Sequence, residues 1–183
     1  MSVGDAAFVA FGSNLNNPVA QLRGAASAVK ALPGVSEFCG SSLYCSPAMG
    51  GPAQGDYCNA VARLCWSGDA ASLLAALLTI EAAAGRQRLD QERNAPRTLD
   101  LDLLLFADLQ LDQPQLQVPH PRMTQRAFVL VPLAELQPEL VLPGLAPLQQ
   151  LLPAVSDQRL ERLPVPRLGE PPLDVGSANL DLY

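Results

Sequence analysis

Two aspartates separated by a single leucine are the most chemically suggestive feature of this sequence. Asp100 and Asp102 lie in segment 98–106, where polar residues alternate with leucines over the first half. In an extended strand both carboxylates would leave the same face, while the leucines would fill the core on the other. Two like charges this close repel each other, so a divalent cation between them is favoured. Two carboxylates, completed by phosphate oxygens and water, are a common site for Mg²⁺.

Arginines are concentrated around this segment, although the chain as a whole is acidic. The sequence has eleven arginines and one lysine among 183 residues, and its formal net charge is −6. Six of the arginines fall between positions 86 and 126: Arg86, Arg88, Arg93, Arg97, Arg122 and Arg126. A guanidinium group binds two phosphate oxygens at once and keeps its charge. The cluster therefore predicts a phosphate-bearing ligand, with ion pairs to Asp90 and Glu92 as the simpler alternative.

The same residues also allow purely structural roles. One aspartate could pair with Arg97 while the other meets solvent. Glu81, near the end of an expected helix, could pair with Arg86 or Arg88 as readily as it could contact a ligand. His120 stands between two prolines, where a histidine is more often a structural hydrogen-bonding group than a catalyst. The sequence contains neither GxxxxGK[ST] nor GxGxxG, so any phosphates must be held by metal and arginine.

The elements that carry these residues can be inferred from the spacing of apolar side chains. Four segments have the patterns of β-strands: residues 6–11, 35–44, 57–66 and 98–106. Two segments between them have helical spacing, with Asn17 as the N-cap of the first and Asp69 as the N-cap of the second. This order predicts an α+β, ferredoxin-like βαββαβ core with an antiparallel sheet. Both helices would cover one sheet face, the other face would be free for a ligand, and residues 122–136 predict C-terminal helical additions.

Length and composition predict one domain over residues 1–163 and a proline-containing tail over 164–183. With 49% hydrophobic residues, the chain can bury a core and is too apolar for a disordered protein. It has no apolar run long enough to span a bilayer, no basic N-terminal region and no CxxC pair. We therefore expect a soluble, cytoplasmic monomer without a zinc site, and the negative net charge argues against a nucleic-acid binder.

Five short motifs occur in an order and at a spacing that resemble one enzyme family. They are FGSNL (11–15), DYCN (56–59), GRQR (85–88), PRTLDLD (96–102) and PHPRM (119–123), followed by Arg126 and Phe128. Together they are similar to the 6-hydroxymethyl-7,8-dihydropterin pyrophosphokinase family over residues 5–155, and the PRTLDLD and VPHPRM segments are highly specific to it. The chain departs from the family's pattern at Leu78, Asn94 and Gln115.

The resemblance implies an enzyme of folate biosynthesis that transfers pyrophosphate from ATP to 6-hydroxymethyl-7,8-dihydropterin, giving AMP and the pterin diphosphate. It implies two Mg²⁺ ions bound by Asp100 and Asp102, with catalytic roles for both residues and for Arg88 and Arg97. The nucleotide-binding residues it implies are Glu81, Arg88, Arg97, Leu103, His120 and Arg126. The pterin-binding residues it implies are Ser46, Pro47, Met49, Tyr57, Asn59 and Phe128. Attack at the β-phosphorus, in preference to the γ-phosphorus, rests on the resemblance as well.

Two other classes of function remain open at this point. A binding module of the same fold would hold a pterin or a nucleotide without turnover, although binding alone does not need paired metal carboxylates. An RNA-binding ferredoxin-like domain would need exposed aromatic and basic groups on its sheet, and the strand segments contain no such motif. Metal-dependent turnover would distinguish the enzyme from both.

Overall fold

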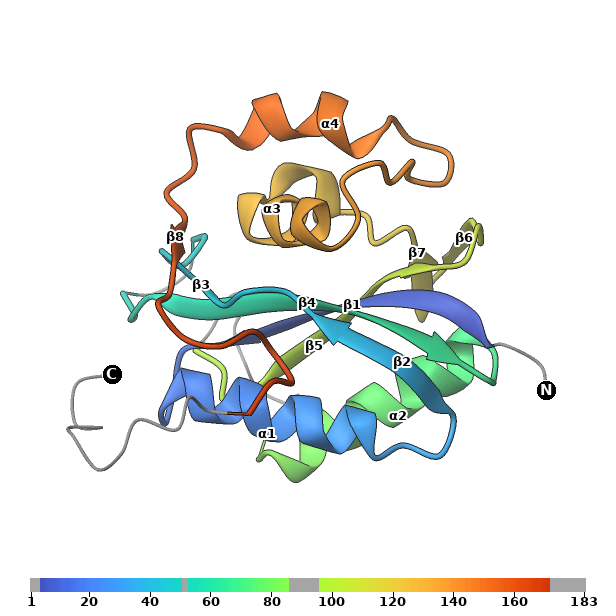
Figure 1. Ribbon diagram of the computed structural model, residues 1–183, viewed down its shortest axis with the longest axis horizontal. Coiled ribbons are helices and arrows are strands. Elements are labelled where there is room, and N and C mark those ends of the chain that lie inside the picture. Colours follow the sequence, from blue (N-terminus) through green and yellow to red (C-terminus); the bar gives the residue numbers. More distant parts are fainter. Residues whose placement is uncertain (1–3, 51–52, 86–95, 172–183) are drawn as a thin grey trace.

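The computed structural model describes residues 4–50, 53–85 and 96–171, arranged in layers around a six-stranded sheet (Figure 1). Helices α1 (Pro18–Lys30) and α2 (Ala70–Ala83) lie on one face, and α3 (Ala127–Leu136) and α4 (Leu148–Leu151) lie on the other. The strands are β1 (Asp5–Ser13), β2 (Val35–Gly40), β3 (Tyr44–Ser46), β4 (Tyr57–Trp66), β5 (Asp100–Phe106), β6 (Leu111–Gln113), β7 (Leu116–Val118) and β8 (Glu161–Arg162). The 3₁₀ helices are η1 (Met123–Gln125) and η2 (Leu152–Val155).

The main sheet has the strand order β5-β1-β4-β3-β8, with β2 also paired to β4, and every pair is antiparallel. The central strand β1 places Ala10 opposite Asp102 of β5 on one side and opposite Val61 of β4 on the other. The predicted α+β, ferredoxin-like core is therefore confirmed. Near the end of β1, Gly12 pairs with Asn59 of β4 and with Asp100 of β5, and this brings residues of both strands to the same edge.

Helices α1 and α2 begin where the sequence predicts. The Asn17 side chain accepts the Ala20 N–H at 3.2 Å, and the Asp69 side chain accepts the Ser72 N–H at 2.8 Å. Gly85 ends α2 with a φ of 83°, a backbone conformation that favours glycine. The apolar stripes of both helices are fully buried against the sheet, through Leu22, Val29, Leu73 and Leu77.

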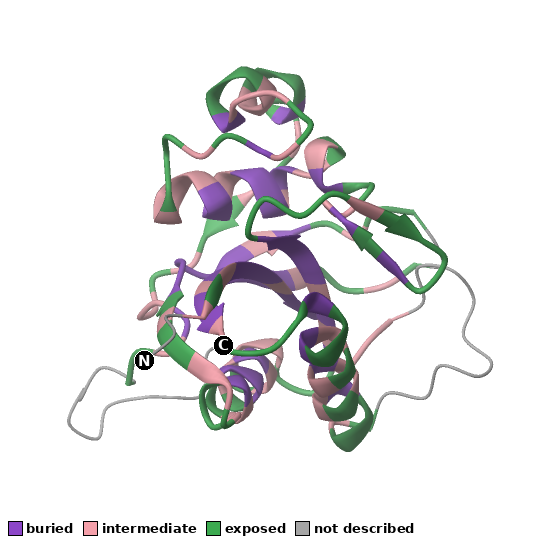
Figure 2. Cartoon of the chain, turned by 90° about the vertical axis from the view of Figure 1, so that its right-hand side faces the viewer, coloured by how far each residue is buried: buried purple, intermediate pink, exposed green. Residues whose placement is uncertain are grey.

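The expectation of a second sheet face free for a ligand is wrong for much of that face. Helix α3, which lies in the predicted helical region over 122–136, covers it, and α4 packs on the outer side of α3. Buried residues therefore lie on both faces of the sheet (Figure 2). Phe8, Val61, Leu104 and Leu130 belong to the apolar cluster that fills this second interface. Any ligand site on this side is therefore confined to the part of the sheet that α3 leaves uncovered.

Three local features differ from the sequence prediction. The segment expected as one strand over 35–44 is interrupted between Gly40 and Tyr44, where Ser41 uses its hydroxyl as well as its backbone to bond Val61. The region expected to be helical over 122–136 is a 3₁₀ turn followed by α3, because Arg126 between them is extended. The β6–β7 hairpin was not predicted.

The beginning of the expected tail packs against the sheet. Leu168 is 1% exposed, and a Cβ on Gly40 would collide with its backbone. The Lys30 ammonium of α1 donates to the Gly169 carbonyl at 2.7 Å. Residues 172–183 lie outside the described part of the chain. Among the described residues, no helix combines the length and apolar character needed to cross a membrane.

Candidate active site

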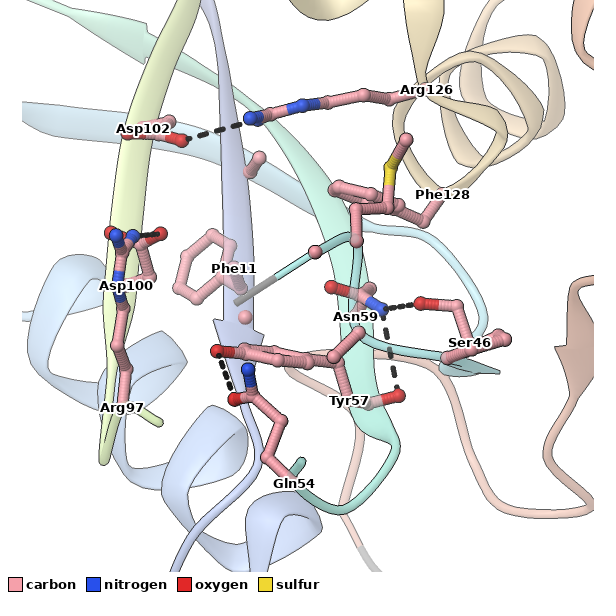
Figure 3. A pocket seen from close by; sticks show the side chains of 16 residues that line it. Phe11, Ser46, Gln54, Tyr57, Asn59, Arg97, Asp100, Asp102, Arg126 and Phe128 are labelled. Atoms are coloured by element: carbon pink, nitrogen blue, oxygen red, sulfur yellow. Dashed lines mark hydrogen bonds and ion pairs between the residues drawn. The ribbon is translucent and has the colours of Figure 1, made fainter. Parts of the chain in front are cut away.

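Most of the expected site residues gather in one pocket at the end of the sheet (Figure 3). Its floor is β1, where Gly12 lies opposite Asn59 of β4 and Asp100 of β5. A Cβ at Gly12 would meet Asn59 Oδ1 at 3.4 Å and Asp100 Cβ at 3.9 Å, so glycine keeps this floor open. Ten expected residues line the pocket: Ser46, Pro47, Met49, Tyr57, Asn59, Arg97, Asp100, Asp102, Arg126 and Phe128.

One wall of the pocket is charged (Figure 3). Asp100 and Asp102 alternate with buried leucines along β5, and their side chains are 19% and 33% exposed. Arg97 Nη1 donates to Asp100 Oδ2 at 2.5 Å, whereas Arg126 Nη1 lies 3.9 Å from Asp102 Oδ2. The structural alternative for Asp100, an ion pair with Arg97, is therefore observed. Asp102 has a guanidinium nearby but beyond hydrogen-bond distance.

The ionisation of this wall reflects its burial. Burial and the charge of Asp100 raise the pKa of Asp102, and His120 and Arg126 oppose only part of that rise. Burial lowers the pKa of Arg97, but the Asp100 carboxylate outweighs it and the pKa is raised overall. The ionised carboxylate of Asp102 is therefore unfavourable so close to Asp100, and a bound cation would lower this cost in free energy.

The opposite wall is aromatic and amide-bearing (Figure 3). Tyr57 and Asn59 project from β4, and Phe128 comes from the first turn of α3. Asn59 Nδ2 donates to Ser46 Oγ at 2.9 Å, and this bond fixes the side-chain amide. The Arg126 guanidinium lies 5.4 Å from the centroid of the Phe128 ring, so the charged and aromatic walls meet at α3.

Two residues that connect the walls were missed by sequence reasoning. The Arg97 N–H donates to Asn14 Oδ1 at 2.8 Å, and Asn14 N–H donates in return to the Arg97 carbonyl at 3.1 Å. Asn14 Nδ2 also donates to Gln54 Oε1 at 2.8 Å, and the Tyr57 hydroxyl donates to the same oxygen at 3.3 Å. Asn14 belongs to the FGSNL motif, which could have indicated it, whereas Gln54 lies in a loop with no recognisable signal.

A second depression lies beside the pocket and shares Asp102 with it. The β6–β7 hairpin lines it, together with Leu103, His120 and Gln115. The His120 N–H donates to the Leu104 carbonyl at 2.8 Å, which places its Nε2 3.9 Å from Asp102 Oδ2. Burial lowers the pKa of His120, with Asp102 acting in the opposite direction, and the Arg122 N–H donates to its Nδ1 at 3.2 Å, so the neutral imidazole is favoured.

Glu81, expected to bind the nucleotide, lines neither depression. Glu81 is 1% exposed, and its Oε1 accepts the Leu101 N–H at 2.7 Å. This placement favours a role in holding β5 between Asp100 and Asp102, in place of the direct nucleotide contact expected for Glu81. Arg88, expected to bind phosphates, lies outside the described residues.

Comparison with known proteins gives a consistent result. A sequence model of 7,8-dihydro-6-hydroxymethylpterin-pyrophosphokinase (HPPK) matches residues 8–138. The 2-amino-4-hydroxy-6-hydroxymethyldihydropteridine pyrophosphokinase of Pseudomonas aeruginosa is 45% identical over 157 residues, covering 86% of this chain and 96% of that protein. The Haemophilus influenzae protein of the same name is 40% identical, covering 86% of this chain and 97% of its own length.

Solved structures support the fold. A crystal structure of Plasmodium falciparum HPPK-DHPS with pteroate matches 81% of this chain with a TM-score of 0.62 at 13% identity. This chain spans 42% of the length of that longer chain. At this level of identity the likeness concerns the fold alone. The family model and the two bacterial relatives establish that this chain belongs to the 7,8-dihydro-6-hydroxymethylpterin-pyrophosphokinase family.

Proposed function

We propose that this pyrophosphokinase transfers the pyrophosphoryl group of ATP to the hydroxymethyl oxygen of 6-hydroxymethyl-7,8-dihydropterin, giving AMP and the pterin diphosphate. The observation that carries the proposal is the position of Asp102 between two adjacent depressions, one with aromatic and amide walls and one beneath the β6–β7 hairpin. Phosphoryl transfer depends chiefly on positioning donor and acceptor and on neutralising charge where they meet. Two neighbouring sites with charged groups between them suit that requirement.

The pocket fits the pterin in shape and chemistry. A pterin is flat and polar, so it can stack on the aromatic faces of Tyr57 and Phe128 while an amide reads its edge. The hydrogen bond from Asn59 to Ser46 holds that amide in one orientation before the substrate arrives. Pro47 and Met49, in the loop after β3, add apolar surface at the rim, and the Met49 side chain is half exposed.

The charged residues fit the phosphates. Arg97 and Arg126 reach the pocket from opposite sides of the Asp100–Asp102 pair, so both can approach phosphate oxygens placed above β5. Asn14 holds the backbone of Arg97 through two hydrogen bonds. Because this backbone is already ordered, Arg97 loses less conformational entropy when it binds phosphate. The His120 imidazole faces the second depression, and because its Nδ1 accepts the Arg122 N–H, its Nε2–H can donate one hydrogen bond to the nucleotide.

Asp100 and Asp102 also fit Mg²⁺, which prefers hard oxygen ligands and keeps part of its water shell. Among the described residues no group of three or more His, Cys, Asp or Glu side chains could hold a metal by itself. A cation at these two carboxylates would therefore need phosphate oxygens, which couples its binding to that of ATP. When bound, Mg²⁺ would neutralise the charge that develops on the phosphate oxygens during transfer.

The experiment is to incubate the protein with ATP, Mg²⁺ and 6-hydroxymethyl-7,8-dihydropterin and to separate the nucleotide and pterin products. We expect one AMP for each pterin diphosphate, and we expect chelation by EDTA to stop the reaction. ADP with a pterin monophosphate would overturn the assignment of the transferred group. Pterin binding without any product would instead indicate a binding module of the same fold.

A further inference from the structure

The carboxylate of Glu135, outside the pocket, binds groups from two other segments of the chain. It belongs to the last turn of α3, and its side chain is 14% exposed. Its carboxylate accepts the Ser42 N–H at 3.0 Å, the Ser42 hydroxyl at 2.8 Å and the Tyr44 hydroxyl at 2.9 Å. The Arg167 guanidinium lies 3.1 Å from the same carboxylate. Glu135 therefore joins α3, the start of β3 and a residue near the C-terminus.

Arg167 belongs to a segment that is bonded along the edge of the sheet. This segment, residues 161–168, is called the C-terminal strap below. Its first residues form β8 and pair with Tyr44 and Cys45 of β3. The Leu163 N–H then donates to the Leu43 carbonyl, and the Leu168 N–H donates to the Ser41 carbonyl, both at 2.8 Å. In Figure 1 the red end of the chain passes β3 and continues towards α1. The strap lies beyond residues 8–138, which the family model matches.

Glu135 belongs to α3, one of the two elements of the aromatic wall, and the strap pairs with β3, the neighbour of β4, which is the other. Helix α3 carries Phe128 at its other end. Strand β3 places Tyr44 opposite Asn59 and Ser46 opposite Tyr57, and Ser46 accepts the bond from the Asn59 amide. A shift of α3 relative to β3 would therefore also shift Phe128 relative to the two β4 side chains.

The charges around Glu135 show why a cation is needed there. A mostly buried carboxylate is costly unless it is paired and hydrogen-bonded. Burial, followed by the hydrogen bond and charge of Glu135, raises the pKa of Tyr44 to about 12, so its hydroxyl stays protonated and remains a donor. Ser42 and Tyr44 supply neutral donors only. Arg167 supplies a cation that compensates the Glu135 charge in the described part of this cluster.

We propose that the C-terminal strap belongs to the pterin-binding apparatus, with Arg167 as a positioning residue that acts through Glu135 to set the width of the aromatic slot. This inference rests on the proposed function, because it requires the pterin to bind between Phe128 and Tyr57. Arg167 touches none of the pocket-lining residues through a described hydrogen bond or ion pair, so its effect is transmitted by α3 and β3. The strap should therefore affect the pterin and leave ATP binding unchanged.

The test compares the full-length wild type with Arg167→Ala and Arg167→Lys, and uses Arg63→Ala as a matched control. Arg63 also makes one ion pair with a glutamate, Glu37, at 3.7 Å, but it lies towards the other end of β4. For Arg167→Ala we expect Kd and KM for the pterin to rise about three- to tenfold, while kcat and KM for ATP change less than about twofold. Arg167→Lys should recover most of the pterin affinity, and Arg63→Ala should match the wild type.

The measurements are made at a temperature where circular dichroism finds every variant folded. A folded Arg167→Ala protein with wild-type pterin affinity would overturn the proposal, as would an equal loss of affinity for ATP and pterin. Wild-type turnover is measured first, with AMP as product. If the wild type fails to bind the pterin, the proposed function and the strap proposal both fail. If the wild type turns over normally and Arg167→Ala is unchanged, the strap proposal alone fails.

Discussion

The two aspartates of β5 interact differently with their neighbouring arginines. Asp100 is engaged by Arg97 at hydrogen-bond distance, whereas Asp102 and Arg126 are 3.9 Å apart. The 3.9 Å between Asp102 Oδ2 and Arg126 Nη1 is longer than a direct hydrogen bond. The carboxylate and the guanidinium can therefore each bind a new partner without first breaking a close contact. Asp102 also faces both depressions. We therefore expect Asp102 to be the more important of the two carboxylates for bringing metal and phosphates together.

A substitution at Asp102 tests this directly. Asp102→Asn removes one negative charge while keeping the shape of the side chain, so the fold should survive. We expect kcat to fall by at least about 10²-fold, the scale seen when one preorganised electrostatic group is lost. The control is Asp108→Asn, an exposed aspartate just beyond the same strand, which should leave steady-state turnover unchanged. Near-normal activity of Asp102→Asn in Mg²⁺ would contradict the metal-site assignment.

We expect Arg97 to stabilise the transition state of the reaction more than it stabilises the fold. Arg97→Ala removes a partly buried cation that lines the pocket, and we expect kcat/KM to fall about 10²- to 10³-fold. Arg159→Ala provides the comparison, because the Arg159 side chain is 68% exposed and its Nη1 lies 4.0 Å from Asp56 Oδ2. Steady-state kinetics of both variants measure the difference. Equal losses would indicate a bulk charge effect in place of a specific clamp.

Among the elements, β5 depends on a side chain from α2. The buried Glu81 carboxylate accepts the N–H of Leu101, which stands between the two aspartates. Glu81→Ala would leave that amide unsatisfied in the core, and we expect the free energy of unfolding to fall by about 1–3 kcal/mol. Glu81→Gln keeps an acceptor oxygen and should lose less. Urea denaturation measures both, and equal midpoints for wild type and Glu81→Ala would disprove the supporting role.

The start of α2 gives a prediction for pH. The capping bonds from Ser72 lower the pKa of Asp69 below its unfolded value of about 3.9. A carboxyl group whose pKa is lower in the folded state contributes stability above its unfolded pKa and loses it as the pH falls through the folded pKa. Wild type should therefore be more stable than Asp69→Asn at pH 7, and the difference should shrink below about pH 4. Denaturation curves between pH 7 and pH 3 measure this, and a difference that grows on acidification would contradict it.

For the whole molecule, the end of the described chain forms part of the core. Leu168 is buried against Gly40 of β2, although it follows two closely spaced prolines. We expect Leu168→Ala to lower the free energy of unfolding by about 2–5 kcal/mol, as for other large-to-small core substitutions. Leu145→Ala, at a side chain that is 47% exposed, should change it by less than about 0.5 kcal/mol. Similar unfolding midpoints for both variants would mean that the segment contributes nothing to the core.

The sequence by itself predicted the main helices and strands of the core and indicated the chemistry of the site. Apolar periodicity and capping residues located α1, α2 and β4 because these signals act between residues close in the chain. The alternation around Asp100 and Asp102 indicated two carboxylates on one face for the same reason. The family motifs then indicated ten residues that the structure brings into one pocket.

Only the tertiary structure decided how these parts meet. The bonds between Arg97 and Asn14 and between Leu101 and Glu81 join residues 83 and 20 positions apart. The bonds of Ser42 and Tyr44 to Glu135 join residues more than 90 positions apart. A sequence pattern reports which residues share a face of one element, but not which face of another element lies against it. The covering of the second sheet face by α3, and the burial of Leu168, depended on such packing between elements distant in the chain.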